Sequence, residues 1–158
     1  MKTVSLRKLA LAGLGIAAFT LMAGLQPAAA HHSFAMYDTT KSKTMTGMLT
    51  RFLPGANHAQ LLFTLVDENG RGMIGEDGRP IVWGVETGPA GMIARQGVTV
   101  ESFPAGTIMT VTLNPLKDGR NFGTLARGGG IINCGMQMPE GGCTEETGKV
   151  YLKVVQPQ

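Results

Sequence analysis

Short runs of alternating apolar and polar residues, separated by turns rich in glycine and proline, dominate the chain after residue 43. Alternation of this kind sends successive side chains to opposite faces of a strand, so it predicts a sheet with one buried face. The pattern predicts strands at 44–52, 58–66, 80–86, 107–113, 122–126, 130–133 and 149–155, with a further extended segment at 98–103.

A single helical segment interrupts the strands. Pro89 stands just before the segment 90–96 and Gly97 follows it, which are typical positions for proline and glycine at helix ends. Three strands, a short helix and then two or more strands is the order of an OB-like barrel. We therefore predict an all-β chain with one short helix, folded as a small OB-like β-barrel that is closed or partly open. A generic β-sandwich is the competing fold.

The first thirty residues have the pattern of a cleavable secretory signal peptide. Lys2, Arg7 and Lys8 precede an uncharged apolar run at 9–25, and small residues follow. Cleavage after Ala30 is the cut that leaves small residues at both positions that require them. This predicts export to the periplasm or beyond, a single domain at 31–158 and no membrane segment after cleavage. An uncleaved membrane anchor is the alternative.

The charge balance argues against a nucleic-acid partner. The whole chain carries a formal net charge of +3, but three basic residues lie in the predicted signal, so the acidic and basic residues of 31–158 balance. Binding to a polyanion requires clustered positive charge.

Cys134 and Cys143 form an even pair in a chain predicted to be exported. Such a pair predicts a disulfide, here closing a short C-terminal loop. The alternative is a soft-metal loop in which Met136 and Met138 join two thiolates around Cu(I).

Several motifs, in a fixed order, resemble those of the DUF6152 family of small exported bacterial proteins. The first is His-His-Ser-Phe-Ala-Met-Tyr-Asp at 31–38. The later ones are Gly47, Asn57-His58, Trp83-Gly84-Val85-Glu86, the segment 104–111 and Lys117-Asp118-Gly119. The resemblance runs from His31 to about Leu125. It implies a fold and an export address but no activity. The proline that the family places between asparagine and histidine is missing here, and the cysteine loop is an addition.

The histidines carry the candidate chemistry. After cleavage, His31 would present a free α-amine beside its own imidazole, and a third nitrogen from His32 or His58 would complete a nitrogen set that suits Cu(II). Both groups of His31 lose protons readily near neutral pH when a metal binds. The structural alternative is that these histidines are ordinary polar residues and that His58 stabilises the turn at Asn57.

The sequence contains no recognisable nucleophile motif or phosphate-binding loop, and it therefore favours a protein that is not an enzyme. The first functional hypothesis is an exported metal-binding protein that uses His31, His32 and His58, with copper as the metal. The second is a non-catalytic OB-like module that binds an envelope protein or a cell-wall ligand. For that module, a partner surface is predicted around Phe52, Phe63 and Trp83.

Overall fold

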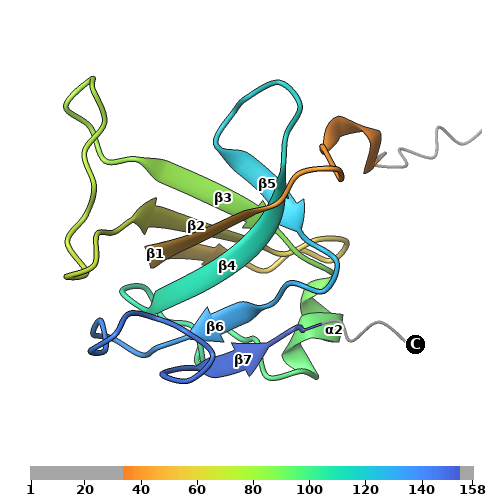
Figure 1. Ribbon diagram of the computed structural model, residues 1–158. Helices are drawn as coiled ribbons and strands as arrows, with labels where there is room; N and C mark the ends of the chain where they lie inside the picture. The colour runs from red at the N-terminus through yellow and green to blue at the C-terminus, as the bar shows by residue number, and fades with distance from the viewer. Residues whose placement is uncertain (1–33, 154–158) are drawn as a thin grey trace, which may run out of the picture. The chain divides into compact units, whose positions relative to one another are not determined.

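Strands are the main regular elements of residues 34–153, the part of the chain that the computed structural model describes. Within these residues Figure 1 shows a barrel of strands with a further hairpin packed beside it. The elements are η1 (Phe34–Met36), β1 (Lys43–Leu53), β2 (Gln60–Leu65), β3 (Val82–Glu86), α2 (Ala90–Ala94), β4 (Ile108–Pro115), β5 (Phe122–Leu125), β6 (Ile131–Asn133) and β7 (Lys149–Tyr151).

The first five strands close into a barrel. Their order is β1-β2-β3-β5-β4, and an additional pairing of β1 with β4 joins the two ends. All of these pairings are antiparallel except β3 with β5, which is parallel. With α2 between the third and fourth strands, this topology confirms the predicted OB-like barrel and resolves it as closed.

Closure depends on β1, because this one strand pairs with both of its neighbours along part of its length. Gly47 lies opposite Leu65 of β2 and opposite Met109 of β4. A register shift between Leu49 and Arg51 then bends the strand, as a bulge does at the corner of a barrel. Residue 47 therefore stands where backbones approach from both sides.

Apolar side chains from all five strands fill the barrel. Ile93 of α2 closes one end and is 2% exposed. The fully buried residues of the strands are Leu49, Leu61, Phe63, Val85, Met109, Val111 and Leu113. This layered interior accounts for the period of two in the sequence.

The segment 98–103, predicted to be extended, is a series of turns, so that prediction is wrong. The Ser102 hydroxyl donates to the Gly97 carbonyl at 2.6 Å and accepts from the Thr99 amide at 2.9 Å. Local hydroxyl bonds thus satisfy backbone groups that a strand would pair with a neighbour. Val98 and Phe103 are both buried, which explains why the segment is apolar without being a strand.

The C-terminal hairpin of β6 and β7 packs beside the barrel through β4. Its connecting loop contains a disulfide between Cys134 and Cys143, whose Cα atoms are 5.8 Å apart. This confirms the predicted disulfide, and the soft-metal alternative fails because both sulfur atoms are bonded to each other. The Thr110 hydroxyl donates to the Cys143 carbonyl at 2.7 Å and ties the loop to β4. No helix among the described residues is both long and apolar enough to cross a membrane.

Candidate functional site

Three polar side chains from separate segments meet at one end of the barrel. His58 lies in the turn between β1 and β2, Glu86 is the last residue of β3, and Tyr37 follows η1. The register between β2 and β3 sets Gln60 opposite Glu86. His58, two residues before Gln60, therefore lies beside the end of β3.

Backbone hydrogen bonds fix the turn that carries His58. The Ala59 amide donates to the Gly88 carbonyl at 3.0 Å, and the Thr87 amide donates back to the Ala59 carbonyl at 2.9 Å. The Ala90 amide, at the start of α2, donates to the Gly55 carbonyl at 3.0 Å. A side chain on Gly55 would collide with the carbonyl of His58, so the close approach requires glycine. These contacts order the turn without a proline before the histidine.

The His58 ring has a defined orientation. Its Nδ1 lies 3.1 Å from the Thr87 carbonyl oxygen, which can only accept a hydrogen bond. Nδ1 therefore carries the proton, and in the neutral ring the lone pair belongs to Nε2. A Glu86 carboxylate oxygen lies 3.5 Å from the same Nδ1. Side-chain exposure is 33% for His58 and 14% for Glu86, so the carboxylate is the more enclosed of the two.

Tyr37 completes the cluster from the other side of Glu86. Its side chain is buried and its hydroxyl hydrogen-bonds to Glu86. Burial, then the negative charge of Glu86 and this hydrogen bond, raise the pKa of Tyr37 to about 12. The segment is held in place because the Asp38 amide donates to the Pro115 carbonyl at 2.8 Å and the Lys117 amide donates to the Met36 carbonyl at 3.0 Å.

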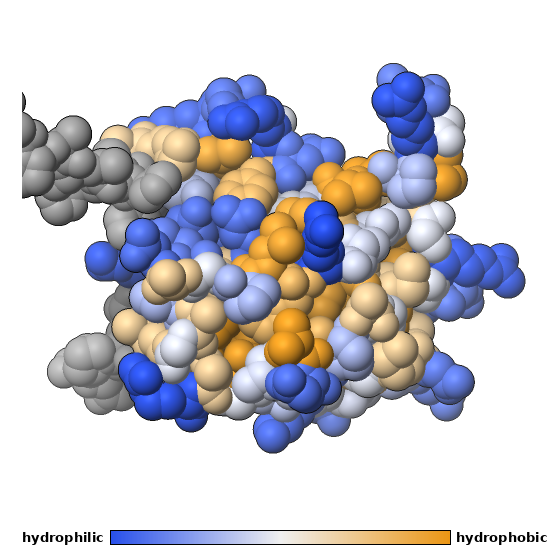
Figure 2. Space-filling view, turned by 180° about the vertical axis from the view of Figure 1, so that it is seen from behind, coloured by the Kyte–Doolittle hydropathy of each residue, from blue (hydrophilic) through white to orange (hydrophobic). Residues whose placement is uncertain are grey.

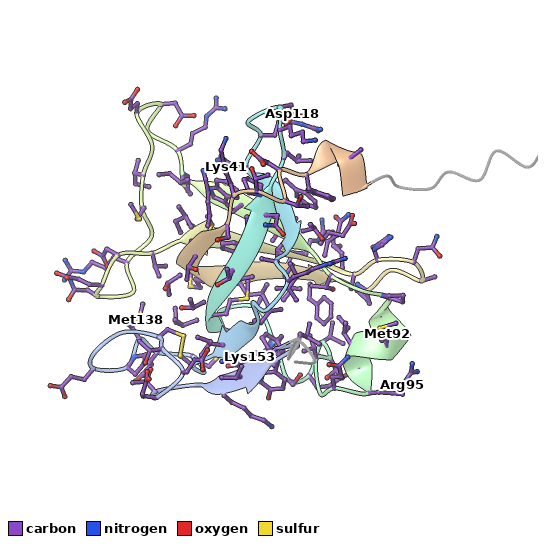
Figure 3. All side chains as sticks on the ribbon, turned by 45° about the vertical axis from the view of Figure 1, so that its right-hand side comes forward. Lys41, Met92, Arg95, Asp118, Met138 and Lys153 are labelled. Carbon is purple, nitrogen blue, oxygen red and sulfur yellow. A yellow bond between two sulfur atoms is a disulfide. The ribbon has the colours of Figure 1, made fainter. Side chains whose placement is uncertain are left out.

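A groove of about 860 Å³ opens beside this cluster. One wall is the arm that leads from Tyr37 into β1, and the floor is formed by the ends of β3, β4 and β5. Figure 3 shows Lys41 on this arm, near the turn that carries Asp118, whereas Met92 lies on α2 and Arg95 caps the C-terminal end of that helix. The groove is lined by Thr39, Thr40, Lys41, Ser42, His58, Glu86, Thr87, Gly88, Asn114, Thr124, Leu125, Ala126 and Arg127.

Comparison with protein families gives one match, which spans residues 18–126 and is DUF6152, described as a family of unknown function. The chain belongs to the DUF6152 family. The match includes Tyr37, His58 and Glu86, whereas the Cys134–Cys143 loop lies beyond it. No curated protein and no solved structure matches the chain.

Of the three histidines predicted as metal ligands in this DUF6152 chain, only His58 belongs to the described residues. His31 and His32 lie outside the described residues. His58 lies in the cluster with Glu86. Within residues 34–153, no group of three or more histidine, cysteine, aspartate or glutamate side chains could hold a metal ion. His58 and Glu86 alone therefore do not make a complete metal centre.

The aromatic residues predicted to form a partner surface belong to the core instead. Phe63 and Trp83 are buried, and Phe52 packs against the core while partly exposed. Inward-facing positions of β2 and β3 hold them in the interior, so they do not form an exposed apolar patch. Figure 2, which views the molecule from behind, shows other apolar residues gathered near the centre of that face.

Sequence reasoning missed the contact between Tyr37 and Glu86. In β3, Trp83 faces the core and Glu86 lies on the opposite face of the strand. The sequence did not reveal the partner of this outward-facing carboxylate. The signal was present, because Tyr37 and Glu86 each belong to a motif shared with the DUF6152 family.

Proposed function

We propose that this protein is exported, cleaved after Ala30, and binds Cu(II) or a similar metal ion between its new N-terminus and His58. The site would take the α-amine and imidazole of His31 and a further nitrogen from His58 or His32. Glu86 acts next to the metal ligands, by holding the imidazole of His58. The convergence of Tyr37, Glu86 and His58 at one end of the groove is the observation that carries the proposal.

The arm connects the proposed N-terminus to this cluster over a short distance. Tyr37 is hydrogen-bonded to Glu86, and His31 lies six residues before it in the chain. A 3-10 helix rises about 2 Å per residue and an extended chain at most about 3.6 Å. Covalent geometry therefore keeps the Cα atom of His31 within about 18 Å of that of Tyr37. The imidazole of His58, which lies beside Glu86, is thus within range of a ligand from the N-terminus.

The ring of His58 has the chemistry of a prepared ligand. A metal-binding histidine commonly donates its second nitrogen to a carbonyl or carboxylate, which sets the tautomer and aims the ring. Nδ1 of His58 has both kinds of acceptor, the Thr87 carbonyl and Glu86. Amine and imidazole nitrogens favour copper among the common divalent metals. The metal would supply a charged coordination centre, while Thr87 and Glu86 keep the proton on Nδ1.

Titration of Cu(II) into the chain that begins at His31 tests the proposal. This chain retains every described strand and the whole described core. Calorimetry and electron paramagnetic resonance should give one tight site with nitrogen ligands. The comparison is the same chain with an acetylated α-amine. Acetylation should weaken binding by about a hundredfold or more, because it removes the amine from the chelate.

Acetylation is a better block than an added residue. One extra residue would place an imidazole third in the chain, where the new amine and two backbone amides could make a copper site of their own. His58→Gln should lower the affinity by about tenfold or more, since it removes a ligand from an otherwise intact set. Equal copper affinity in the free and acetylated chains refutes the proposal.

A further inference from the structure

The groove beside His58 continues into a second hollow. The smaller hollow has a volume of about 300 Å³ and lies over the outer side of β1 and β4. Ser42, Ala126 and Arg127 line both. Arg127 therefore stands where the two hollows meet, and together they form one trough along the outside of the barrel.

Several polar groups in this trough have no partner within residues 34–153. The guanidinium of Arg127 makes no ion pair or hydrogen bond there, and neither do the hydroxyls of Thr39, Ser42 and Thr124. Thr124 is only 8% exposed. Because Thr124 is nearly buried and lines the groove, a partner for its hydroxyl would have to bind within the groove. Unused donors and acceptors in a concave site favour a ligand that is itself rich in polar groups.

Charge is distributed unevenly along the trough. At one end Glu86 is a carboxylate already engaged with Tyr37 and His58. Near the middle, Lys41 pairs with Asp38 at 3.0 Å, so its charge is largely compensated. Arg127 is then the one cation of the described lining without a carboxylate partner. Glu145 also lines the smaller hollow, but it pairs with Lys153 at 2.7 Å, so its charge is largely compensated. An anionic group would be attracted to Arg127 and repelled from the Glu86 end.

We propose that this trough binds a polyhydroxylated carboxylate, with the chemistry of a uronic acid, and that Arg127 holds its carboxylate. A guanidinium matches a carboxylate through two parallel hydrogen bonds. Hydroxyls of the ligand would meet Thr124, Ser42 and the Glu86 carboxylate. Asn114 also contributes, because its amide donates to the Lys41 carbonyl at 2.6 Å and its side-chain oxygen remains an acceptor. No phenylalanine, tyrosine or tryptophan lines the described trough, so a neutral sugar lacks the large aromatic surface on which sugars stack.

This role makes the chain a ligand-binding module and does not depend on copper. The test therefore uses the chain from His31 after treatment with a chelator, so that failure of the metal site leaves the result unaffected. Binding of galacturonate, galactose and trigalacturonate is measured by calorimetry. We expect saturable binding of galacturonate and affinity about tenfold or more weaker for galactose, which lacks the carboxylate. Equal binding of the two sugars, or saturation by neither galacturonate nor trigalacturonate, overturns the proposal.

Two variants locate the carboxylate. Arg127→Gln should weaken galacturonate binding by about tenfold or more, because it removes the charged fork but keeps hydrogen-bond capacity. Arg95→Gln is the matched control, since Arg95 is an exposed arginine at the C-terminal end of α2, away from Lys41 (Figure 3), and its loss should change nothing. Unchanged binding in Arg127→Gln, with the thermal unfolding of both variants like wild type, refutes the assignment. If trigalacturonate binds more tightly than galacturonate, the carboxylate that the protein recognises belongs to an anionic glycan. If galacturonate binds more tightly, it belongs to a free sugar acid.

Discussion

Replacing Gly47 by alanine tests how the barrel closes. Gly47 lies in β1 where this strand pairs with both β2 and β4. A methyl group built on its Cα would lie 2.7 Å from the backbone oxygen of Thr64 and would strike the ring of Phe63. Carbon contacts in proteins are comfortable at about 3.5–4.0 Å. Relief therefore requires β2 to move by several tenths of an ångström, away from a barrel interior that is already full.

The expected cost follows from two opposing effects. Overpacking a filled core costs about 1–3 kcal/mol, and the upper end applies because a backbone atom and a buried ring must both move. Alanine also restricts the unfolded chain, which returns roughly 0.5–1 kcal/mol. The net expectation is a loss of about 2 kcal/mol in the free energy of unfolding.

Denaturation by urea, followed through the fluorescence of Trp83, measures this loss. Gly91→Ala is the matched control, because Gly91 lies in α2, has no atom within 4 Å of the added methyl and has ordinary helical backbone. That variant should gain about 0.5–1 kcal/mol. The two alanine substitutions thus shift stability in opposite directions. A Gly47→Ala protein as stable as wild type would show that the barrel does not close tightly at this position.

Three further outcomes are expected. Replacing both Cys134 and Cys143 by serine should lower the free energy of unfolding by about 2.6 kcal/mol, the chain-entropy value for a loop with a sequence separation of 9, and should leave Cu(II) affinity unchanged in calorimetry. The wild-type protein should lose stability as the pH rises from 10 through about 12, because the pKa of Tyr37 is about 12 in the folded state against 10.0 in a free side chain. Denaturation curves should assign at most about 2.7 kcal/mol of the free energy of unfolding to this effect, and Tyr37→Phe should abolish it. Glu86→Gln should weaken Cu(II) binding by about tenfold, as loss of an outer electrostatic partner of a metal ligand does, while a copper affinity equal to wild type would leave Glu86 without a role at the metal.

The fold was largely predictable because its signals are local. Alternation gave the strands, and Pro89 with Gly97 marked the one helix, which begins at Ala90. The same reasoning failed at 98–103, where Val98 and Phe103 are buried by a turn and not by a strand. Apolar spacing alone does not distinguish the two, because the decisive bonds come from the hydroxyls of Thr99 and Ser102.

The site was less predictable because its parts are distant in the chain. Tyr37 and Glu86 are separated by most of three strands, and they meet only because the arm crosses the end of the barrel. Arg127 and the trough depend on how β5 ends beside that arm, which no local pattern encodes. The aromatic residues Phe63 and Trp83 were offered as a surface, but their inward register in β2 and β3 was already implied by the alternation.

The motifs that this chain shares with its family divide into two physical roles. Gly47 and Trp83 serve packing, since one permits close strands and the other fills the interior. Tyr37, His58 and Glu86 do more than pack, because Tyr37 is buried but a barrel end gains nothing in packing from enclosing a carboxylate against its phenol. Enclosing a charge costs free energy unless other groups compensate for it, and phenylalanine with glutamine would fill the same space. A cost of this kind is retained where the charge has a use. Here the carboxylate lies 3.5 Å from the protonated nitrogen of an imidazole at the mouth of a groove, beside an arm that begins a few residues after the predicted cleavage point.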